Sequence, residues 1–186
     1  MKRTQLILIS GKIEAGKSTL ADYINDEFDL RGYTSKVFHV AESLKIISRK
    51  VFGWDGVKDY KGRKFLQDLG KTVRSYNPDY WVENTQLLIE NDKDYPFDVI
   101  IIDDWRYPNE MSYLSSNPLY EVYPIRIERR LEVCDSHESE VSLPNIKDAP
   151  EGCYYATFHN DSNLESLRDF ATKLFFELVQ KENKNV

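Results

Sequence analysis

Residues 11 to 18 combine two glycines, a lysine and a serine in an order typical of a phosphate-binding loop. The stretch Gly11-Lys-Ile-Glu-Ala-Gly-Lys-Ser18 matches G-x-x-x-x-G-K-[ST] at every fixed position. Glycines let successive backbone N–H groups point at one anion, and Lys17 can reach the β- and γ-phosphates of ATP. The Ser18 hydroxyl is the expected ligand to Mg²⁺. The residues expected to contact ATP are Gly11, Lys12, Glu14, Ala15, Gly16, Lys17, Ser18, Thr19 and, much later in the chain, Asn160.

Two adjacent carboxylates, Asp103 and Asp104, end the most aliphatic stretch of the chain, Phe97 to Asp104. An acid that ends a buried strand beside a phosphate loop is the usual place to hold magnesium, directly or through water. Neighbouring strand residues point to opposite faces, so one of the two should face the metal. Arg106 follows closely, and its planar guanidinium suits a phosphate. The alternative is a structural ion pair of Arg106 with Asp104 or Glu110.

A basic segment lies at residues 45 to 75, with nine basic and three acidic side chains in a chain whose net charge is −6. A local positive field in an acidic protein favours a small anionic ligand over nucleic acid, which the acidic remainder would repel. Four polar residues of this segment share one face of a predicted helix: Arg63, Gln67, Lys71 and Arg74. The alternative is a solvated basic helix face.

Strand and helix patterns alternate along the chain, which predicts an α/β fold with three layers, α/β/α, around a five-stranded parallel sheet. Ligands of such sheets bind beyond the carboxyl ends of the strands. The aliphatic run Phe97–Asp104 should form the sheet centre. The other predicted strands are Gln5–Ser10, Lys36–Val40, Tyr120–Ile127 and Ala156–His159. The predicted helices are Lys17–Asp29, Glu42–Phe52, Arg63–Ser75, Tyr80–Asn91 and Leu164–Lys181.

The length of 186 residues, with 41% hydrophobic and 30% charged residues, suits one globular domain spanning 1–186. The basic start is followed by an apolar run too short for an export signal, and no run reaches membrane length. Cys134 and Cys153 form no disulfide framework. We therefore expect a cytoplasmic protein, in the host cytoplasm if it is viral.

The sequence resembles the bacteriophage-type deoxynucleoside monophosphate kinases, a family within the P-loop kinases. Besides the phosphate loop, the stretches that carry the resemblance are "RKFLQDLGKTVRSYNPDYWV" (63–82), "IIDDWRYPNE" (101–110), "DSHESE" (135–140) and "HNDSNLESL" (159–167). Two positions depart from the family pattern: Ser18 stands where the family often has Asp, and Trp105 where it usually has Val.

The resemblance implies transfer of the γ-phosphoryl group of ATP to a deoxynucleoside monophosphate, with Mg²⁺ as cofactor. Aligned with the family, Asp104 is the strand-end acid that holds the metal together with Ser18. The implied catalytic residues are Lys17, Asp104, Arg106 and Arg129. The helical segment of about residues 42–92 is implied to bind the acceptor through Arg63, Gln67, Lys71, Arg74, Trp81 and Arg106. Trp81 could instead belong to the core. The implied partner is the small acceptor. From charge and hydropathy we expect no nucleic acid and no membrane as partner, and we expect a monomer or homodimer.

Residues 128–144 lack clean periodicity and follow the fourth predicted strand, where nucleotide kinases carry a mobile lid. Arg129 and Arg130 are the candidate lid arginines, while His137 and Glu140 have no assigned role. Asn160 could contact adenine or belong to a helix N-cap. Other readings stay open: a dephospho-coenzyme A or phosphomevalonate type of kinase, or a switch that binds ATP without an acceptor.

Overall fold

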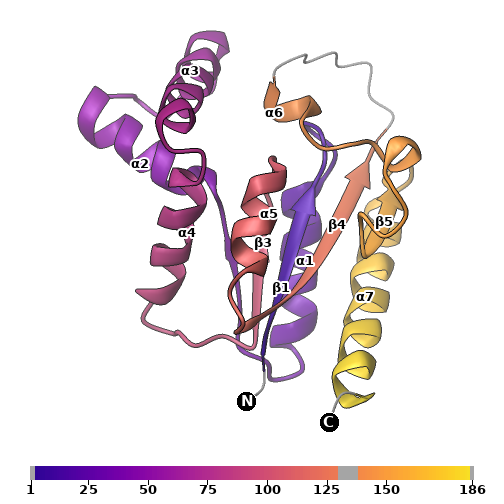
Figure 1. The fold of residues 1–186 in the computed structure, drawn as a ribbon. Helices are drawn as coiled ribbons and strands as arrows, with labels where there is room; N and C mark the ends of the chain where they lie inside the picture. The colour runs from indigo at the N-terminus through magenta and orange to yellow at the C-terminus, as the bar shows by residue number, and fades with distance from the viewer. Residues whose placement is uncertain (1–2, 130–137, 185–186) are drawn as a thin grey trace.

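The computed structural model describes residues 3–129 and 138–184, and its centre is a sheet of five parallel strands (Figure 1). The strand order is β2-β3-β1-β4-β5. The strands are β1 (Thr4–Ser10), β2 (Ser35–Phe38), β3 (Val99–Ile102), β4 (Tyr120–Glu128) and β5 (Ala156–His159). The predicted fold class is therefore confirmed. The expected sheet centre was wrong, because β1 is central and β3 lies beside it. Both strands are buried on both faces, so an aliphatic run does not tell them apart.

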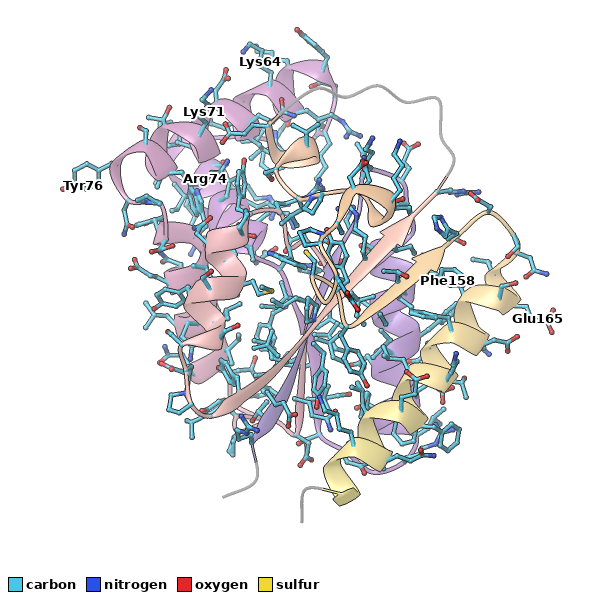
Figure 2. The ribbon with its side chains drawn as sticks, turned by 45° about the vertical axis from the view of Figure 1, so that its right-hand side comes forward. Lys64, Lys71, Arg74, Tyr76, Phe158 and Glu165 are labelled. Atoms are coloured by element: carbon cyan, nitrogen blue, oxygen red, sulfur yellow. The ribbon has the colours of Figure 1, made fainter. Side chains whose placement is uncertain are left out.

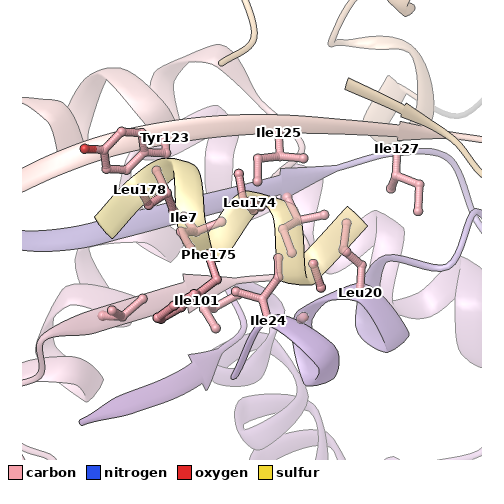
Figure 3. Packing of buried hydrophobic residues seen from close by; sticks show 14 of the residues in the cluster. Ile7, Leu20, Ile24, Ile101, Tyr123, Ile125, Ile127, Leu174, Phe175 and Leu178 are labelled. Carbon is pink, nitrogen blue, oxygen red and sulfur yellow. The ribbon is translucent and has the colours of Figure 1, made fainter. Parts of the chain in front are cut away.

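One face of the sheet is covered by α1 (Lys17–Asp29) and α7 (Leu164–Lys184) (Figure 1). Side chains of alternate strand residues, such as Ile7, Ile101 and Ile125, meet the two helices in one apolar cluster (Figure 3). Burial of each such side chain contributes about 1.5–3 kcal/mol. This packing fixes α1, and with it the phosphate loop (residues 11–18), against the sheet.

The intervening strand residues face a second apolar cluster with α4 (Tyr80–Glu90) and α5 (Pro108–Ser115). The sequence did not predict α5, because eight residues are too few to show helical periodicity. Its signals were Pro108 in the first turn and Glu110 at the third helical position, which together mark a helix start. This short helix orients the turn that carries Arg106.

Two further helices, α2 (Ala41–Phe52) and α3 (Tyr60–Tyr76), lie beyond the carboxyl end of β2 (Figure 1). Asp59 caps α3 by accepting a hydrogen bond from the Gly62 N–H at 2.7 Å, so the helix begins three residues before the predicted start. The short α6 (Glu138–Val141) and a 3₁₀ turn (Ile146–Asp148) precede β5. Among the described helices, none is long and apolar enough to cross a membrane.

Candidate functional site

The phosphate loop connects β1 to α1 and is closely packed at both glycines. A Cβ atom at Gly11 would lie 2.4 Å from the Ile127 carbonyl oxygen, so no other residue fits there. Gly16 has a φ of +99°, and a Cβ atom there would lie 2.6 Å from Nδ2 of Asn160. The glycines predicted from the motif are therefore required by backbone conformation and by the approach of β4 and the β5–α7 junction.

Lys17 begins α1, and its ammonium group lies on the phosphate loop itself. Its Nζ donates hydrogen bonds of 2.8 Å to the carbonyl oxygens of Gly11 and Lys12. No side chain caps the start of α1, and its first turn contains no acidic residue. The backbone N–H groups of this turn and the positive end of the helix dipole can therefore serve an anion.

Asp103 is the carboxylate that contacts the phosphate loop. The Ser18 hydroxyl donates a 2.6 Å hydrogen bond to its Oδ2, and Nδ1 of His39 contacts its Oδ1. Burial alone would raise the pKa of the Asp103 carboxyl, but the hydrogen bonds with His39 and Ser18 lower it below the usual value. The hydrogen bond with Asp103 in turn raises the pKa of His39. Asp103 is thus held ionised beside the expected ligand of magnesium.

Asp104 faces the start of α2. Its two oxygens accept hydrogen bonds from the backbone N–H groups of Val40 at 2.6 Å and Ala41 at 3.0 Å. Burial and the neighbouring charge of Asp103 raise the pKa of Asp104. The sequence-based assignment put Asp104 with Ser18, whereas the structure brings Asp103 to that hydroxyl. The reason is that β3 ends at Ile102, so both acids lie in a turn and strand alternation does not orient them.

The three side chains of His39, Asp103 and Asp104 offer ligand atoms that all lie within 4.8 Å of one another. His39 directly follows β2, and its side chain is half-buried at the carboxyl edge of the sheet. The sequence had placed it among the polar strand ends but assigned it no role. The sequence feature that points to it is its position near the end of a predicted strand, since ligands of parallel sheets bind beyond the strand ends.

A cavity of about 450 Å³ extends from the phosphate loop to α3, and we call it the α3 cavity. Among the residues predicted to bind the acceptor, Arg63, Gln67, Arg74, Trp81 and Arg106 all line it. Its wall is rich in cations, contributed by Lys17, Lys45, Lys58, Arg63, Arg74 and Arg106. The carboxylates on the wall are fewer, namely Glu14, Asp103, Asp104 and Glu110.

Lys71 is the one predicted acceptor residue that does not line the α3 cavity. Its exposed Nζ lies 3.9 Å from Oε2 of Glu138 on α6. Figure 2 shows Lys71 and Arg74 on α3, with Tyr76 extending away from the molecule near the end of the helix. Only part of the predicted face of α3 therefore lines the α3 cavity.

Arg74 is held by an aromatic side chain that the sequence did not single out. Its guanidinium lies 4.3 Å from the centre of the Tyr107 ring and donates a 2.9 Å hydrogen bond to the Tyr107 hydroxyl. Arg63 donates from Nε to the Lys58 carbonyl oxygen at 2.9 Å. Among the described residues, no hydrogen bond of the Gln67 amide is found. The α3 face thus presents two oriented cations and an available amide.

Glu110 fixes the turn that precedes α5. Its Oε2 accepts hydrogen bonds from the backbone N–H groups of Arg106 at 2.8 Å and Tyr107 at 3.1 Å. Burial raises the pKa of Glu110 to about 7.

Trp81 is only 2% exposed, and its Nε1 donates to the Gly70 carbonyl oxygen at 3.2 Å. Trp81 is therefore a core residue whose edge reaches the cavity.

A second hollow, the β5–α7 hollow, lies on the other side of the phosphate loop and is lined by Arg129, Asn160 and residues 162–165. Figure 2 shows Glu165 near the start of α7. Asn160 joins the hollow to the loop, because its Nδ2 donates to the Ala15 carbonyl oxygen at 2.9 Å. Asn163, whose Oδ1 accepts from the Ser166 N–H at 3.0 Å, caps α7 instead of Asn160.

The middle of the predicted lid (residues 128–144) falls outside the described residues, since 130–137 are not described and these include Arg130 and His137. The side chain of Glu140 is not described either. Arg129 is exposed at the end of β4. Ser142, just after α6, donates a hydrogen bond to the Arg106 carbonyl oxygen. The end of the predicted lid therefore contacts the turn that lines the α3 cavity.

Comparisons with known proteins find solved structures of kinases with a similar fold. An APS kinase from Mycobacterium tuberculosis in complex with AMPPNP and APS has a TM-score of 0.52 and 9% identity, covering 94% of this chain and 99% of that one. An unliganded sugar kinase from Janibacter sp. HTCC2649 has a TM-score of 0.50 and 15% identity, covering 92% and 93%. No family model and no curated protein matches the sequence. At such identities the likeness shows the fold alone.

Proposed function

We propose that this protein is a P-loop kinase that transfers the γ-phosphoryl group of ATP to the phosphate of a deoxynucleoside monophosphate. The observation that carries the proposal is the α3 cavity. It begins at Lys17, Ser18 and Asp103, where the phosphates of ATP would end, and its wall contains more cations than carboxylates. A small dianion is the ligand that such a cavity suits.

ATP would bind with its phosphates in the phosphate loop and its base in the β5–α7 hollow. The backbone N–H groups of the loop and of the first turn of α1 would bind the phosphates, and Lys17 would move from the loop carbonyls to the β- and γ-phosphates. The volume of the hollow, about 520 Å³, is sufficient for a base. Asn160 links the hollow to the loop, and Arg129 stands on its wall.

Ser18 and Asp103 would hold Mg²⁺, because an ionised carboxylate and a hydroxyl are oxygen ligands of the kind magnesium prefers. The ion supplies neutralisation of the charge that builds up on the phosphates during transfer. Asp104, which caps α2, would keep the backbone around His39 and Ala41 in place. This assignment replaces Asp104 with Asp103 as the metal-holding acid.

The acceptor would lie in the α3 cavity with its phosphate towards the loop. Arg106 and Arg74 would bind that phosphate, while Arg63 and Gln67 lie further along α3. A phosphate acceptor is already ionised near neutral pH, so the transfer needs no general base. Positioning and neutralisation of charge would therefore supply most of the rate enhancement.

The proposal is tested by measuring ADP release from ATP against a panel of acceptors. The panel contains the deoxynucleoside and ribonucleoside monophosphates, dephospho-coenzyme A, phosphomevalonate, adenosine phosphosulfate and simple sugars. Turnover with one or more nucleoside monophosphates and none with the other acceptors is expected. Turnover only with another acceptor, or ATP binding without turnover on the whole panel, would overturn the proposal.

A second candidate function is transfer to an alcohol, as in a dephospho-coenzyme A type of kinase. The contact between His39 and Asp103 on the cavity wall favours it, because a hydroxyl acceptor must lose a proton during transfer. His39→Gln separates the two candidates. Transfer to an alcohol should fall steeply in this variant at every magnesium concentration. Transfer to a phosphate should recover most of its rate when magnesium is raised, since His39 there only supports the metal-holding Asp103.

A further inference from the structure

The peptide unit between Ala15 and Gly16 sets the direction of one N–H group of the phosphate loop. In a planar trans peptide the carbonyl oxygen and the N–H group point in opposite directions, so fixing one fixes the other. The Ala15 carbonyl oxygen is turned towards the end of β5, where it accepts a 2.9 Å hydrogen bond from Nδ2 of Asn160. The Gly16 N–H therefore points away from Asn160, and within the described part of the chain it has no acceptor. It is available to an anion.

Asn160, which follows β5 directly, is held at both its backbone and its side chain. Its backbone N–H donates a 2.7 Å hydrogen bond to the Glu128 carbonyl oxygen at the end of β4. Its side chain is only 8% exposed, and a Cβ atom at Gly16 would lie 2.6 Å from its Nδ2. A carbonyl oxygen can only accept, so the nitrogen of the amide, and not its oxygen, faces Ala15. One buried side chain thus ties the phosphate loop to the end of β4.

This tie matters because the loop is not held by its own contacts alone. Glu14 has a φ of +62°, which is unfavourable for a residue with a side chain and persists only where the surroundings impose it. Inside the loop, the Ala15 N–H donates to the Lys12 carbonyl oxygen at 3.2 Å, and Lys17 bonds two loop carbonyls. The bonds of Lys17 are lost when its ammonium group moves to the phosphates. The hydrogen bond from Asn160 does not depend on Lys17, so it still holds the loop when the nucleotide is bound.

We propose that Asn160 is a positioning residue, which keeps the Gly16 N–H aimed at the phosphates of ATP. It acts through the peptide unit between Ala15 and Gly16, and its role is not the contact with adenine that the sequence suggested. Without the tie this peptide unit can turn over, and only the molecules whose N–H points into the loop bind the phosphates fully. The inference rests on the proposed function in placing the phosphates of ATP in the phosphate loop. It does not depend on which acceptor is used.

The test compares binding of tripolyphosphate, which has no base, with binding of a non-hydrolysable ATP analogue, both with magnesium. Calorimetric titrations are made with wild type, Asn160→Asp and Asn109→Asp. Asn160→Asp keeps the shape of the side chain but puts a carboxylate oxygen in place of the donor. It should weaken binding of both ligands by the same factor, roughly tenfold.

Asn109→Asp is the matched control. Nδ2 of Asn109 also donates to a backbone carbonyl oxygen of another segment, that of Pro78 at 3.0 Å, but Asn109 lines neither the α3 cavity nor the β5–α7 hollow. This variant should unfold at a lower temperature and bind both ligands as wild type does. Asn160→Ala removes the donor without adding a charge and should weaken both ligands equally, so it serves if Asn160→Asp does not fold.

NMR of the protein with ¹⁵N-labelled glycine gives a second readout, which a merely structural role would not change. The chain has eight glycines, so the resonance of Gly16 can be assigned. In wild type the saturating ATP analogue should move the Gly16 amide proton downfield, because its N–H then donates to a phosphate. In Asn160→Asp or Asn160→Ala, saturated with the same analogue, this downfield shift should be clearly smaller.

Three results would contradict the inference. Weaker binding of the ATP analogue, with tripolyphosphate binding unchanged, would make Asn160 a contact of the base. Unchanged affinity for both ligands and an unchanged Gly16 shift, with a lower unfolding temperature, would make its role structural, although the proposed function would stand. If wild type binds neither ligand, the phosphate loop does not bind ATP, and both the inference and the proposed function are wrong.

Discussion

The Ser18 hydroxyl donates a 2.6 Å hydrogen bond to the Asp103 carboxylate, although 85 residues separate the two in sequence. The parallel pairing of β1 with β3, with Leu8 opposite Ile102, brings the ends of the two strands to the same edge of the sheet. The phosphate loop follows one strand and the acid follows the other. A phosphate site and a metal site therefore arise together from the register of two neighbouring strands.

Asp103→Asn should raise the magnesium concentration needed for half-maximal ATP turnover by about 10- to 100-fold, because it removes the charge beside Ser18. Asp104→Asn is the matched control. It should mainly lower stability, by about 1 kcal/mol, because it weakens the cap of α2. Magnesium titrations of both variants check this prediction. If Asp104→Asn raised this magnesium concentration more than Asp103→Asn, Asp104 and not Asp103 would be the residue that holds the metal.

Lys17→Ala should reduce turnover at least about a thousandfold, because the charge that would follow the transferred phosphoryl group is lost. Its unfolding temperature should change little, since the ammonium group donates hydrogen bonds to two carbonyl oxygens of the phosphate loop itself and does not join that loop to another element through them. Lys173→Ala, on the exposed surface of α7, is the control and should keep full activity. If Lys17→Ala kept a tenth of the wild-type rate, the phosphate loop would have no part in the chemistry.

Arg63→Ala and Arg74→Ala should each raise the KM for the acceptor about ten- to a hundredfold, the loss expected for a charge-assisted contact of about 1.5–3 kcal/mol. The KM for ATP should change little. Lys71→Ala is the control from the same helix, since this lysine contacts Glu138 outside the cavity. Unchanged acceptor kinetics with lower stability would mean that the two arginines are structural.

Glu110→Gln should change how stability depends on pH. The pKa of Glu110 is raised to about 7 by burial, so between about pH 4.5 and 7 the folded protein binds a proton that the unfolded chain has already lost. This group therefore lowers the free energy of unfolding as pH rises through that window, by at most about 3 kcal/mol. Glutamine can accept both backbone hydrogen bonds without titrating. The free energy of unfolding of the variant should therefore not show this decline with rising pH.

Urea unfolding of wild type and Glu110→Gln at a series of pH values tests this prediction. The exposed Glu151→Gln serves as a control and should follow wild type throughout. If the free energies of unfolding of wild type and Glu110→Gln changed in parallel between about pH 4.5 and 7, the buried carboxyl would not bind a proton in the folded state.

Local patterns in the sequence predicted much of the fold. The phosphate loop, the five strands and the longer helices follow from short motifs and periodicity, and their boundaries agree with the structure to within a few residues. The short α5 was missed because its start signals, Pro108 and Glu110, stand in a helix of eight residues. Periodicity needs a longer segment to be recognised.

The site was harder to predict because it depends on tertiary geometry. Asp103 and Asp104 lie in a turn, so their directions follow from the contacts of the turn with Ser18 and α2. On a helix of 3.6 residues per turn, Lys71 lies about 80° around from Arg63, whereas Gln67 and Arg74 lie within about 40°. The face of α3 that the spacing predicts includes Lys71, so it is wider than the part of the helix that lines the α3 cavity.

The most direct test of the account is phosphorus NMR of the products formed from ATP, magnesium and a deoxynucleoside monophosphate. We expect ADP and a deoxynucleoside diphosphate to form together, with the new phosphate in a pyrophosphate linkage, and no such product with Lys17→Ala. A new phosphate ester on a hydroxyl group would contradict the account. So would inorganic phosphate as the only product while the monophosphate remains unchanged.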